Sequence, residues 1–157
     1  MIVSHKHRFI FLKTNKTAGT SVEIALSKFC GPDDIITAIS VEDERTRREL
    51  GYRGQQNHTL SFPRHLFSSW KGWLLAGGHL YNHMSAREAR SVLGKQIWDS
   101  YYKFCIERNP WDRVVSLYYW RCQQEPRPSI AEFLDSGVPK ALKRNGYGVY
   151  TINDQIA

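Results

Sequence analysis

Short apolar runs alternate along this chain with segments of helical periodicity. Residues 9–12 (Phe-Ile-Phe-Leu) form a continuous apolar run, which predicts a strand buried on both faces. After the polar residues 13–19, apolar side chains recur at the spacing of one helical face, at Val22, Ala25, Leu26 and Phe29. Thr20 and Glu23 have the spacing of a capping box, so the predicted helix begins there.

The same alternation continues through the rest of the sequence. Further extended segments are predicted at residues 35–39, 73–76 and 101–106, whereas residues 51–64 are expected to form an irregular surface loop. Strands that alternate with helices are typical of an α/β fold. The sequence therefore predicts a single α/β domain over residues 1–157, with a central, mainly parallel sheet.

Four further helices are predicted from residues that favour helix starts. These cap residues are Ser40, Ser85, Asn109 and Ser129. Each of the three serines is followed three positions later by an acidic residue, and Asn109 is followed by Pro110, which suits the first helical position. The helix from Pro110 carries aromatic residues that are expected in the core, namely Trp111, Tyr118, Tyr119 and Trp120.

Composition limits the class of protein without naming a function. The length and the 41% apolar content suit one globular domain, and no apolar stretch is long enough to predict a transmembrane segment. Three scattered cysteines favour reduced thiols in a cytoplasmic protein. The 22 Lys and Arg against 15 Asp and Glu give a formal charge of +7. This charge favours an anionic partner, which leaves nucleic acid, an acidic membrane surface and a small phosphorylated ligand open.

The first candidate site is the polar turn that follows residues 9–12. A turn between a strand and a helix N-terminus gathers unpaired backbone N–H groups, and the helix dipole adds to their attraction for an anion. Lys16 would add a positive charge, and Gly19 would let the backbone approach a ligand. Because the lysine precedes the glycine, this is not the P-loop pattern of nucleotide triphosphatases, and a metal-free anion site fits better. The alternative is a well-capped loop with a solvated lysine.

The second candidate site, at residues 108–116, repeats this arrangement. Arg108 follows the predicted strand at residues 101–106 and precedes a helix. Ligands on open parallel sheets bind at the carboxyl ends of strands, so Lys16 and Arg108 are expected to face one crevice. Ser116 would add a hydroxyl if the helix passes alongside the ligand. The alternative is an exposed arginine and an ordinary helical serine.

Together the two segments resemble the nucleotide-binding motifs of sulfotransferases that use 3′-phosphoadenosine 5′-phosphosulfate, particularly the Golgi-type carbohydrate enzymes and their bacterial relatives. That family carries Pro-Lys-Thr-Ala/Gly-Gly/Ser-Thr-Ser after its first strand, and residues 15–21 read Asn-Lys-Thr-Ala-Gly-Thr-Ser. The family's second motif is Arg-Asp/Asn-Pro-aromatic-Asp/Glu-Arg-x-x-Ser, and residues 108–116 match it throughout. Asn15 replaces the usual proline, but asparagine also suits tight turns.

The resemblance implies a fold, a reaction and a set of site residues. The fold would be a three-layer domain similar to the P-loop nucleotide triphosphatases. The reaction would move a sulfuryl group from 3′-phosphoadenosine 5′-phosphosulfate to an acceptor hydroxyl, such as one on a carbohydrate, with neither metal nor nucleic acid. The 5′-phosphosulfate would contact Lys16, Thr17, Ala18, Gly19, Thr20 and Ser21, and the 3′-phosphate would contact Arg108 and Ser116. Lys16 would also be catalytic, because it would stabilise charge on the leaving oxygen.

Sulfuryl transfer to a hydroxyl also needs a base, and histidine suits that role near neutral pH. His79 is the predicted catalytic base, because it follows two glycines after the predicted strand at residues 73–76. Some members of the family also carry a catalytic histidine in a similar Gly-His context. His58 is the second candidate and could instead contact the acceptor, and His83 is the third. A structural histidine is the main alternative.

Three other hypotheses stay open at the level of sequence. A small-molecule kinase would need Mg²⁺ and ATP. A nucleic-acid-binding fragment would lose affinity steeply with salt. The third is a domain that is incomplete at its C-terminus, because relatives usually continue with another strand and further helices.

Overall fold

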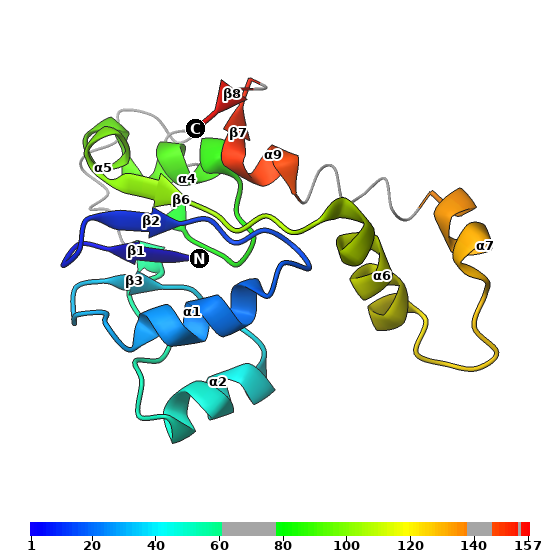
Figure 1. Cartoon of the computed structure of the whole chain (residues 1–157). Coiled ribbons are helices and arrows are strands. Elements are labelled where there is room, and N and C mark those ends of the chain that lie inside the picture. Colours follow the sequence, from blue (N-terminus) through cyan, green and yellow to red (C-terminus); the bar gives the residue numbers. More distant parts are fainter. Residues whose placement is uncertain (61–77, 138–145, 154) are drawn as a thin grey trace.

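A mixed four-stranded sheet forms the centre of the protein (Figure 1). The computed structural model describes residues 1–60, 78–137, 146–153 and 155–157. The strands lie in the order β3–β1–β2–β6, with bounds β1 (Ile2–Ser4), β2 (Phe9–Phe11), β3 (Ile35–Ile36) and β6 (Tyr102–Phe104). β1 is antiparallel to β2 and to β3, whereas β2 and β6 are parallel.

The expected mainly parallel sheet is therefore corrected to a mixed one. β1 was not predicted, and the turn at residues 5–8 brings the chain back so that β2 runs antiparallel to it. The parallel pair matters most for function. Phe11 of β2 lies opposite Phe104 of β6, so both strands end at the same edge of the sheet. The predicted strand at residues 73–76 lies outside the described residues.

Helices and two antiparallel strand pairs complete the described structure. The helices are α1 (Gly19–Ser27), α2 (Val41–Glu49), α4 (Ala86–Leu93), α5 (Lys95–Ser100), α6 (Pro110–Arg121), α7 (Ile130–Asp135) and α9 (Tyr147–Tyr150). One pair joins β4 (Thr59–Leu60) to β5 (Gly78–His79), and the other joins β7 (Thr151–Ile152) to β8 (Gln155–Ile156). Within the described residues, no helix is long and apolar enough to cross a membrane.

Local capping signals placed most helix starts correctly. The predicted caps of α2, α4, α6 and α7 are confirmed, since each side chain accepts a backbone hydrogen bond: Ser40, Ser85, Asn109 and Ser129. The capping box predicted for α1 is wrong. The residue before α1 is Ala18, which has a left-handed φ of 60° and gives no side-chain cap. Glu23 points instead into the interior, where it is fully buried.

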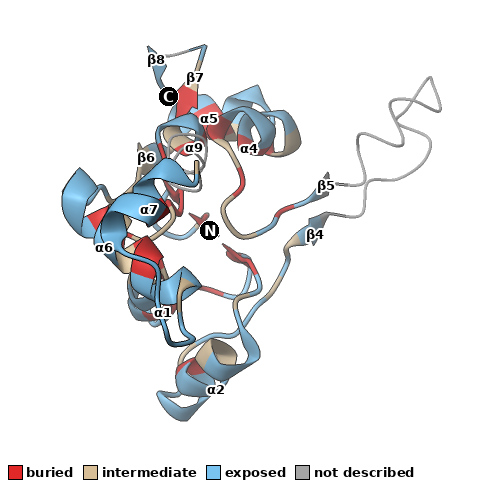
Figure 2. Ribbon diagram, turned by 90° about the vertical axis from the view of Figure 1, so that its right-hand side faces the viewer, coloured by how far each residue is buried: buried red, intermediate tan, exposed pale blue. Residues whose placement is uncertain are grey.

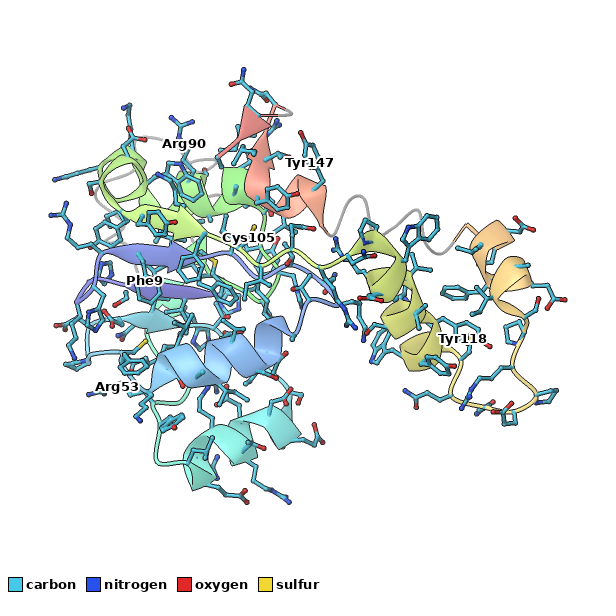
Figure 3. The ribbon with its side chains drawn as sticks, viewed as in Figure 1. Phe9, Arg53, Arg90, Cys105, Tyr118 and Tyr147 are labelled. Carbon is cyan, nitrogen blue, oxygen red and sulfur yellow. The ribbon has the colours of Figure 1, made fainter. Side chains whose placement is uncertain are left out.

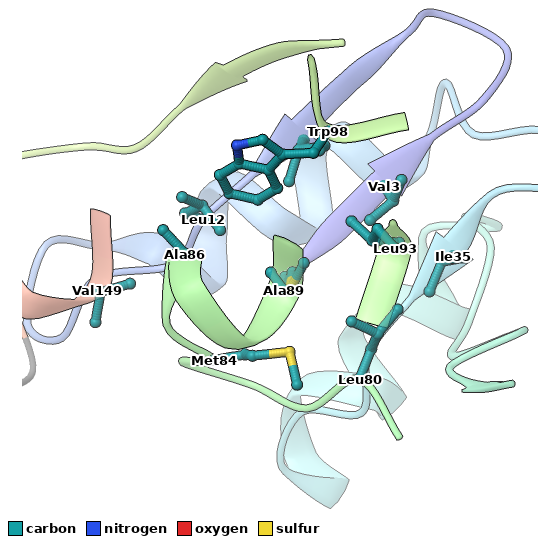
Figure 4. Packing of buried hydrophobic residues seen from close by; sticks show 12 residues of the cluster. Val3, Leu12, Ile35, Leu80, Met84, Ala86, Ala89, Leu93, Trp98 and Val149 are labelled. Carbon is teal, nitrogen blue, oxygen red and sulfur yellow. The ribbon is translucent and has the colours of Figure 1, made fainter. Parts of the chain in front are cut away.

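Helices cover both faces of the sheet and bury two separate apolar clusters. On one face, Val3 and Leu12 pack with residues of α4 and α5, including Ala89 and Trp98 (Figure 4). On the other face, strand residues such as Phe11 pack against α1. Strand side chains alternate between faces, so neighbouring residues such as Phe11 and Leu12 serve different clusters. The order of helix, sheet and helix makes a three-layer α/β domain.

A smaller cluster joins α6 to α7, away from the sheet (Figure 3). It contains Tyr118, whose hydroxyl donates to the carbonyl of Pro128 at 2.7 Å. The expected burial of the other α6 aromatics is wrong, because Trp111, Tyr119 and Trp120 are 74%, 55% and 53% exposed. Figure 2 shows how much of the α6 surface is open.

A buried carboxylate ties the helices to the sheet. Glu23 Oε2 of α1 lies 3.0 Å from Lys13 Nζ, just beyond β2. Its Oε1 accepts hydrogen bonds from the Met1 amino group at 2.9 Å and the Thr37 hydroxyl at 3.2 Å. Arg47 Nη2 of α2 lies 3.8 Å away, and all five residues are buried. One side chain thus links two helices to the ends of three strands.

Replacement of this carboxylate tests its structural role. We expect Glu23→Gln to lower the free energy of unfolding by about 3–5 kcal/mol, because buried cations are left without a counter-charge. Urea unfolding measures the change. The matched control is Glu49→Gln, on the exposed surface of α2, which should change stability by no more than about 0.5 kcal/mol. Equal effects of the two substitutions would contradict the role of Glu23.

Candidate functional site

A cavity of about 620 Å³ opens between α6 and the loop that joins β2 to α1. This Lys16 loop comprises residues 13–18. We name it the Lys16 cavity. It is lined by the loop, the start of α1, the segments after β5 and β6, and one side of α6: Lys13, Thr14, Asn15, Lys16, Ala18, Gly19, Thr20, His83, Arg108, Ser116, Leu117, Trp120 and Arg121. The loop follows β2 and Arg108 follows β6, so the parallel strand pair brings the two segments to one edge.

The backbone of the Lys16 loop is tightly curled. Lys16 and Ala18 have left-handed φ angles of 61° and 60°, which non-glycine residues adopt only when their surroundings hold them. Inside the loop, the Thr14 and Thr17 hydroxyls lie 2.8 Å apart, and Thr14 Oγ1 donates to the carbonyl of Ile106 at 2.5 Å. These bonds fix the loop against the segment after β6. The first N–H groups of α1 lack a side-chain cap and suit an anion.

Gly19 leaves space for the side chain that supports the loop. A Cβ at this position would lie 2.8 Å from Lys13 Cγ and 3.4 Å from the Thr14 carbonyl oxygen. Lys13 runs beneath Gly19 to reach Glu23, and its buried ammonium is neutralised there. The packing of Lys13 therefore favours glycine at this position.

The cavity wall is strongly cationic. Besides Lys13, it contains Lys16, Arg108 and Arg121, and none of the described residues that line it is acidic. Partial burial and then the charge of Arg108 lower the pKa of the Lys16 ammonium. Lys16 and Arg108 are close enough to affect one another, and no described residue of the wall carries a carboxylate. This arrangement favours an anion that carries several charges.

Trp120 is a cavity residue that sequence analysis assigned to the core. Lys16 Nζ lies 5.1 Å from the centre of its ring, and Arg121 Cζ lies 5.0 Å from it. The ring therefore makes cation–π contacts with two of the cavity's positive groups. The sequence carries no signal of this role, because the spacing of aromatic residues along a helix does not show which of them line a cavity.

Arg113 holds α6 in place beside the Lys16 loop. Its Nε donates to the carbonyl of Asn15 at 2.7 Å, and its Nη1 lies 3.7 Å from Glu107 Oε2. A Cβ on Gly146 would lie 2.3 Å from the same Nη1, so the backbone at residue 146 rests against the guanidinium group. Arg113 belongs to the second sequence motif, and here it positions the two motifs relative to one another.

The structure brings together most of the predicted nucleotide-binding residues. Those that line the cavity are Lys16, Ala18, Gly19, Thr20, Arg108 and Ser116. Thr17 and Ser21 do not line it. The hydroxyl of Thr17 is buried and donates to the Thr14 carbonyl, whereas Ser21 is exposed beyond the cavity.

The predicted base His79 does not line the Lys16 cavity. It lies in β5, where its Nδ1 is 3.3 Å from the Thr59 hydroxyl and its ring packs edge-on against His58 at 5.2 Å. His83, the third candidate, does line the cavity. Its Nδ1 is 2.9 Å from the carbonyl oxygen of Lys13, in the Lys16 loop.

Comparison with known proteins decides the family. A family model described as "Sulfotransferase family" matches residues 1–149. The chain belongs to the sulfotransferase family. A segment of 55 residues is 46% identical to an uncharacterized protein of Archaeoglobus fulgidus, and the match covers 34% of this chain and 46% of that protein. No solved structure matches the chain.

The described part of this sulfotransferase-family chain holds no cluster of three or more metal-ligating side chains (His, Cys, Asp or Glu). The charges of the Lys16 cavity come from lysine and arginine side chains. Such side chains bind phosphate and sulfate groups through charge-assisted hydrogen bonds. The charge of the described lining therefore suits an anionic ligand.

The close packing of Gly19 on Lys13 gives a direct test of the loop. We expect Gly19→Ala to lower the free energy of unfolding by about 1–3 kcal/mol, because the added methyl group displaces a buried side chain. Chemical denaturation measures the effect. In Gly54→Ala the new methyl group would meet only Glu44 Oε2, at 3.7 Å, so this control should be nearly neutral. A Gly19→Ala protein as stable as the control would show that Lys13 is not confined by this contact.

Proposed function

We propose that the Lys16 cavity binds 3′-phosphoadenosine 5′-phosphosulfate and that the protein transfers its sulfuryl group to an acceptor hydroxyl. The observation that carries the proposal is the meeting of both sequence motifs, Lys16 with Arg108 and Ser116, on one cavity wall that has no carboxylate among its described residues. The volume of the Lys16 cavity lies in the range of about 300–1,000 Å³ that is usual for small-molecule sites. Membership of the sulfotransferase family supports sulfuryl transfer as the reaction.

The two ends of the nucleotide would contact different parts of the wall. Lys16 and the uncapped N-terminus of α1 favour the 5′-phosphosulfate, because they combine a mobile charge with backbone N–H groups. Arg108 and Ser116 favour the 3′-phosphate, because a guanidinium group and a hydroxyl can both donate to it. Substitutions at the two ends should therefore affect the binding of the 5′-phosphate and the 3′-phosphate separately.

Lys16 has a second part in the proposed reaction. As the sulfuryl group leaves, negative charge develops on the oxygen that stays with the 5′-phosphate. An ammonium group at that oxygen stabilises the charge more in the transition state than in the ground state, which accelerates the reaction. The acceptor is proposed to be a hydroxyl compound, and carbohydrate is the class that the family resemblance favours.

Adenosine 3′,5′-bisphosphate and adenosine 5′-monophosphate separate the two ends of the site. We expect Lys16→Ala to weaken binding of both nucleotides, because both carry a 5′-phosphate. Arg108→Ala should weaken binding of the bisphosphate alone. Each loss should be about 10- to 100-fold in Kd, typical of a charge-assisted hydrogen bond. Isothermal titration calorimetry measures these constants.

The matched control removes a cation outside the cavity. Lys95 of α5 is exposed and pairs with Asp99, so Lys95→Ala should leave both affinities unchanged. An equal loss for the two nucleotides in Arg108→Ala would contradict the assignment of Arg108 to the 3′-phosphate. Failure of the folded wild-type protein to bind the bisphosphate would refute the proposed function.

The effect of removing metal ions distinguishes the proposed sulfotransferase from a kinase. We expect addition of EDTA to change the Kd of the bisphosphate by less than about twofold, because lysine and arginine side chains provide the charge. Calorimetry with and without Mg²⁺ measures it, and ATP serves as the comparison ligand. Strictly Mg²⁺-dependent binding that favours ATP would contradict the proposal and support a kinase.

The residue that accepts the hydroxyl proton is a separate element of the reaction. His79 stays the prediction made from sequence. Its contacts with Thr59 and His58 lie at the β4–β5 strand pair, whereas the proposed donor site lies between the Lys16 loop and α6. The chemistry requires a base close to the transferred group.

A further inference from the structure

A second hollow lies beside the Lys16 cavity, at the C-terminal end of α6. It has a volume of about 510 Å³, and we name it the Trp120 groove. It is lined by the last turn of α6 and the segment that follows: Trp120, Arg121, Cys122, Gln123, Gln124 and Pro128. Trp120 and Arg121 also line the Lys16 cavity, so the two hollows share a wall. A ligand in the groove would therefore contact side chains that also face the proposed donor site.

Hydrogen bonds hold the two sides of the Trp120 groove together. The chain leaves the end of α6 and turns toward α7 (Figure 1). The Tyr118 hydroxyl donates to the Pro128 carbonyl at 2.7 Å. Arg127 Nε donates to the Cys122 carbonyl at 2.7 Å. These bonds tie the segment after α6 back onto the helix, so a ligand would not have to order the groove when it binds.

The Trp120 groove has a positive charge without a carboxylate partner among the described residues. Arg121 forms no ion pair within this part of the chain. The acidic residue nearest to it in the sequence, Glu125, pairs instead with Arg127 at 3.2 Å. A guanidinium group binds a carboxylate through two parallel hydrogen bonds. The groove therefore favours a ligand that carries a negative charge.

The other groups of the groove suit a ring that bears hydroxyls. The Trp120 indole is half-exposed, and the C–H groups on one face of a sugar ring can pack on such a surface. Gln123 and Gln124 have side-chain amides, which donate and accept hydrogen bonds as hydroxyl groups do. Gln123 Nε2 donates to the Trp120 carbonyl at 3.1 Å, which holds this amide beside the helix end. Indole, amide and guanidinium groups together fit a hydroxylated ring with a carboxylate.

The groove adjoins the Lys16 end of the proposed donor site. Lys16 Nζ lies 5.1 Å from the centre of the Trp120 ring. Ser116, the proposed contact of the 3′-phosphate, lies one helical turn earlier in α6, about 6 Å along the helix axis. Because Lys16 is proposed to hold the 5′-phosphosulfate, a ligand on Trp120 would lie beside the sulfuryl group. An acceptor hydroxyl has to be held close to that group in order to react.

On the basis of the function proposed above, we propose that the Trp120 groove is the acceptor site and that it selects an acidic sugar. The carboxylate of the sugar binds Arg121, and its ring packs on Trp120. Gln123 and Gln124 bind hydroxyl groups of the ring. Helix α6 then serves both substrates, since Ser116 binds the donor and the last turn of the helix binds the acceptor.

Two sugars that differ in one group test the charge selection. Methyl glucuronide has a carboxylate where methyl glucoside has a hydroxymethyl group. Nitrogen-15 NMR of the full chain, saturated with adenosine 3′,5′-bisphosphate, measures both Kd values, and Trp120→Phe assigns the indole N–H signal. We expect the glucuronide to shift this signal and to bind at least about 10-fold more tightly than the glucoside. Arg121→Gln should abolish this difference.

Three results would overturn the acceptor site while the donor site would stand. These are equal affinity for the two sugars, a Trp120 signal that neither sugar moves, and tighter binding of a phenol such as 4-methylphenol than of the glucuronide. Absence of bisphosphate binding by the folded protein would instead refute the proposed function, and the acceptor role of the groove with it.

Gln124→Ala separates the two hollows, because Gln124 lines the groove and not the Lys16 cavity. It should weaken binding of the glucuronide by about 3- to 10-fold, as expected for one lost hydrogen bond, and change the Kd of the bisphosphate by less than about twofold. The matched control is Trp111→Ala, an exposed position of α6 that lines neither hollow, which should leave both affinities unchanged. Unchanged glucuronide binding in Gln124→Ala, or an equal loss in Trp111→Ala, would overturn the placement of the acceptor.

Discussion

The buried carboxylate of Glu23 connects the sheet to α1 and α2 through its ion pairs and hydrogen bonds. Through Lys13, Thr37 and the Met1 amino group it reaches the ends of three strands, and it lies in α1 with Arg47 of α2 nearby. Charges in a protein interior are tolerated only when paired, so this cluster fixes the relative positions of these elements. The Lys16 loop runs from Lys13 to the start of α1. The ion pair between Lys13 and Glu23 therefore joins the first residue of the loop to the helix that follows it.

The cavity follows from this constraint and from one parallel strand pair. β2 and β6 end at the same edge, so the loop after β2 and the segment after β6 must meet there. Arg113 completes the junction through its bond to the Asn15 carbonyl. The result is a cationic wall with a strained, fixed backbone and no carboxylate among the described lining residues. Such a wall stabilises anions without the reorganisation that a flexible cluster of lysines would need.

The sequence predicted features that depend on near neighbours and missed those that depend on distant ones. Capping at Ser85 and Ser129 involves residues three positions apart, and these helix starts were correct. The spacing of Thr20 and Glu23 suggested another cap, but Glu23 is used by a buried cluster that local spacing cannot reveal. Motif recognition predicted the cationic site. It named His83 only as a third candidate base, because the placement of His83 in the cavity depends on a left-handed turn and on a bond to the carbonyl of Lys13, 70 residues away.

We propose that one nucleotide spans both motifs in the Lys16 cavity. A crystal structure of the protein with adenosine 3′,5′-bisphosphate tests this placement. We expect the 5′-phosphate at Lys16 and the first N–H groups of α1, and the 3′-phosphate at Arg108 and Ser116. A nucleotide bound outside this cavity, or bound with its two phosphates exchanged, would contradict it.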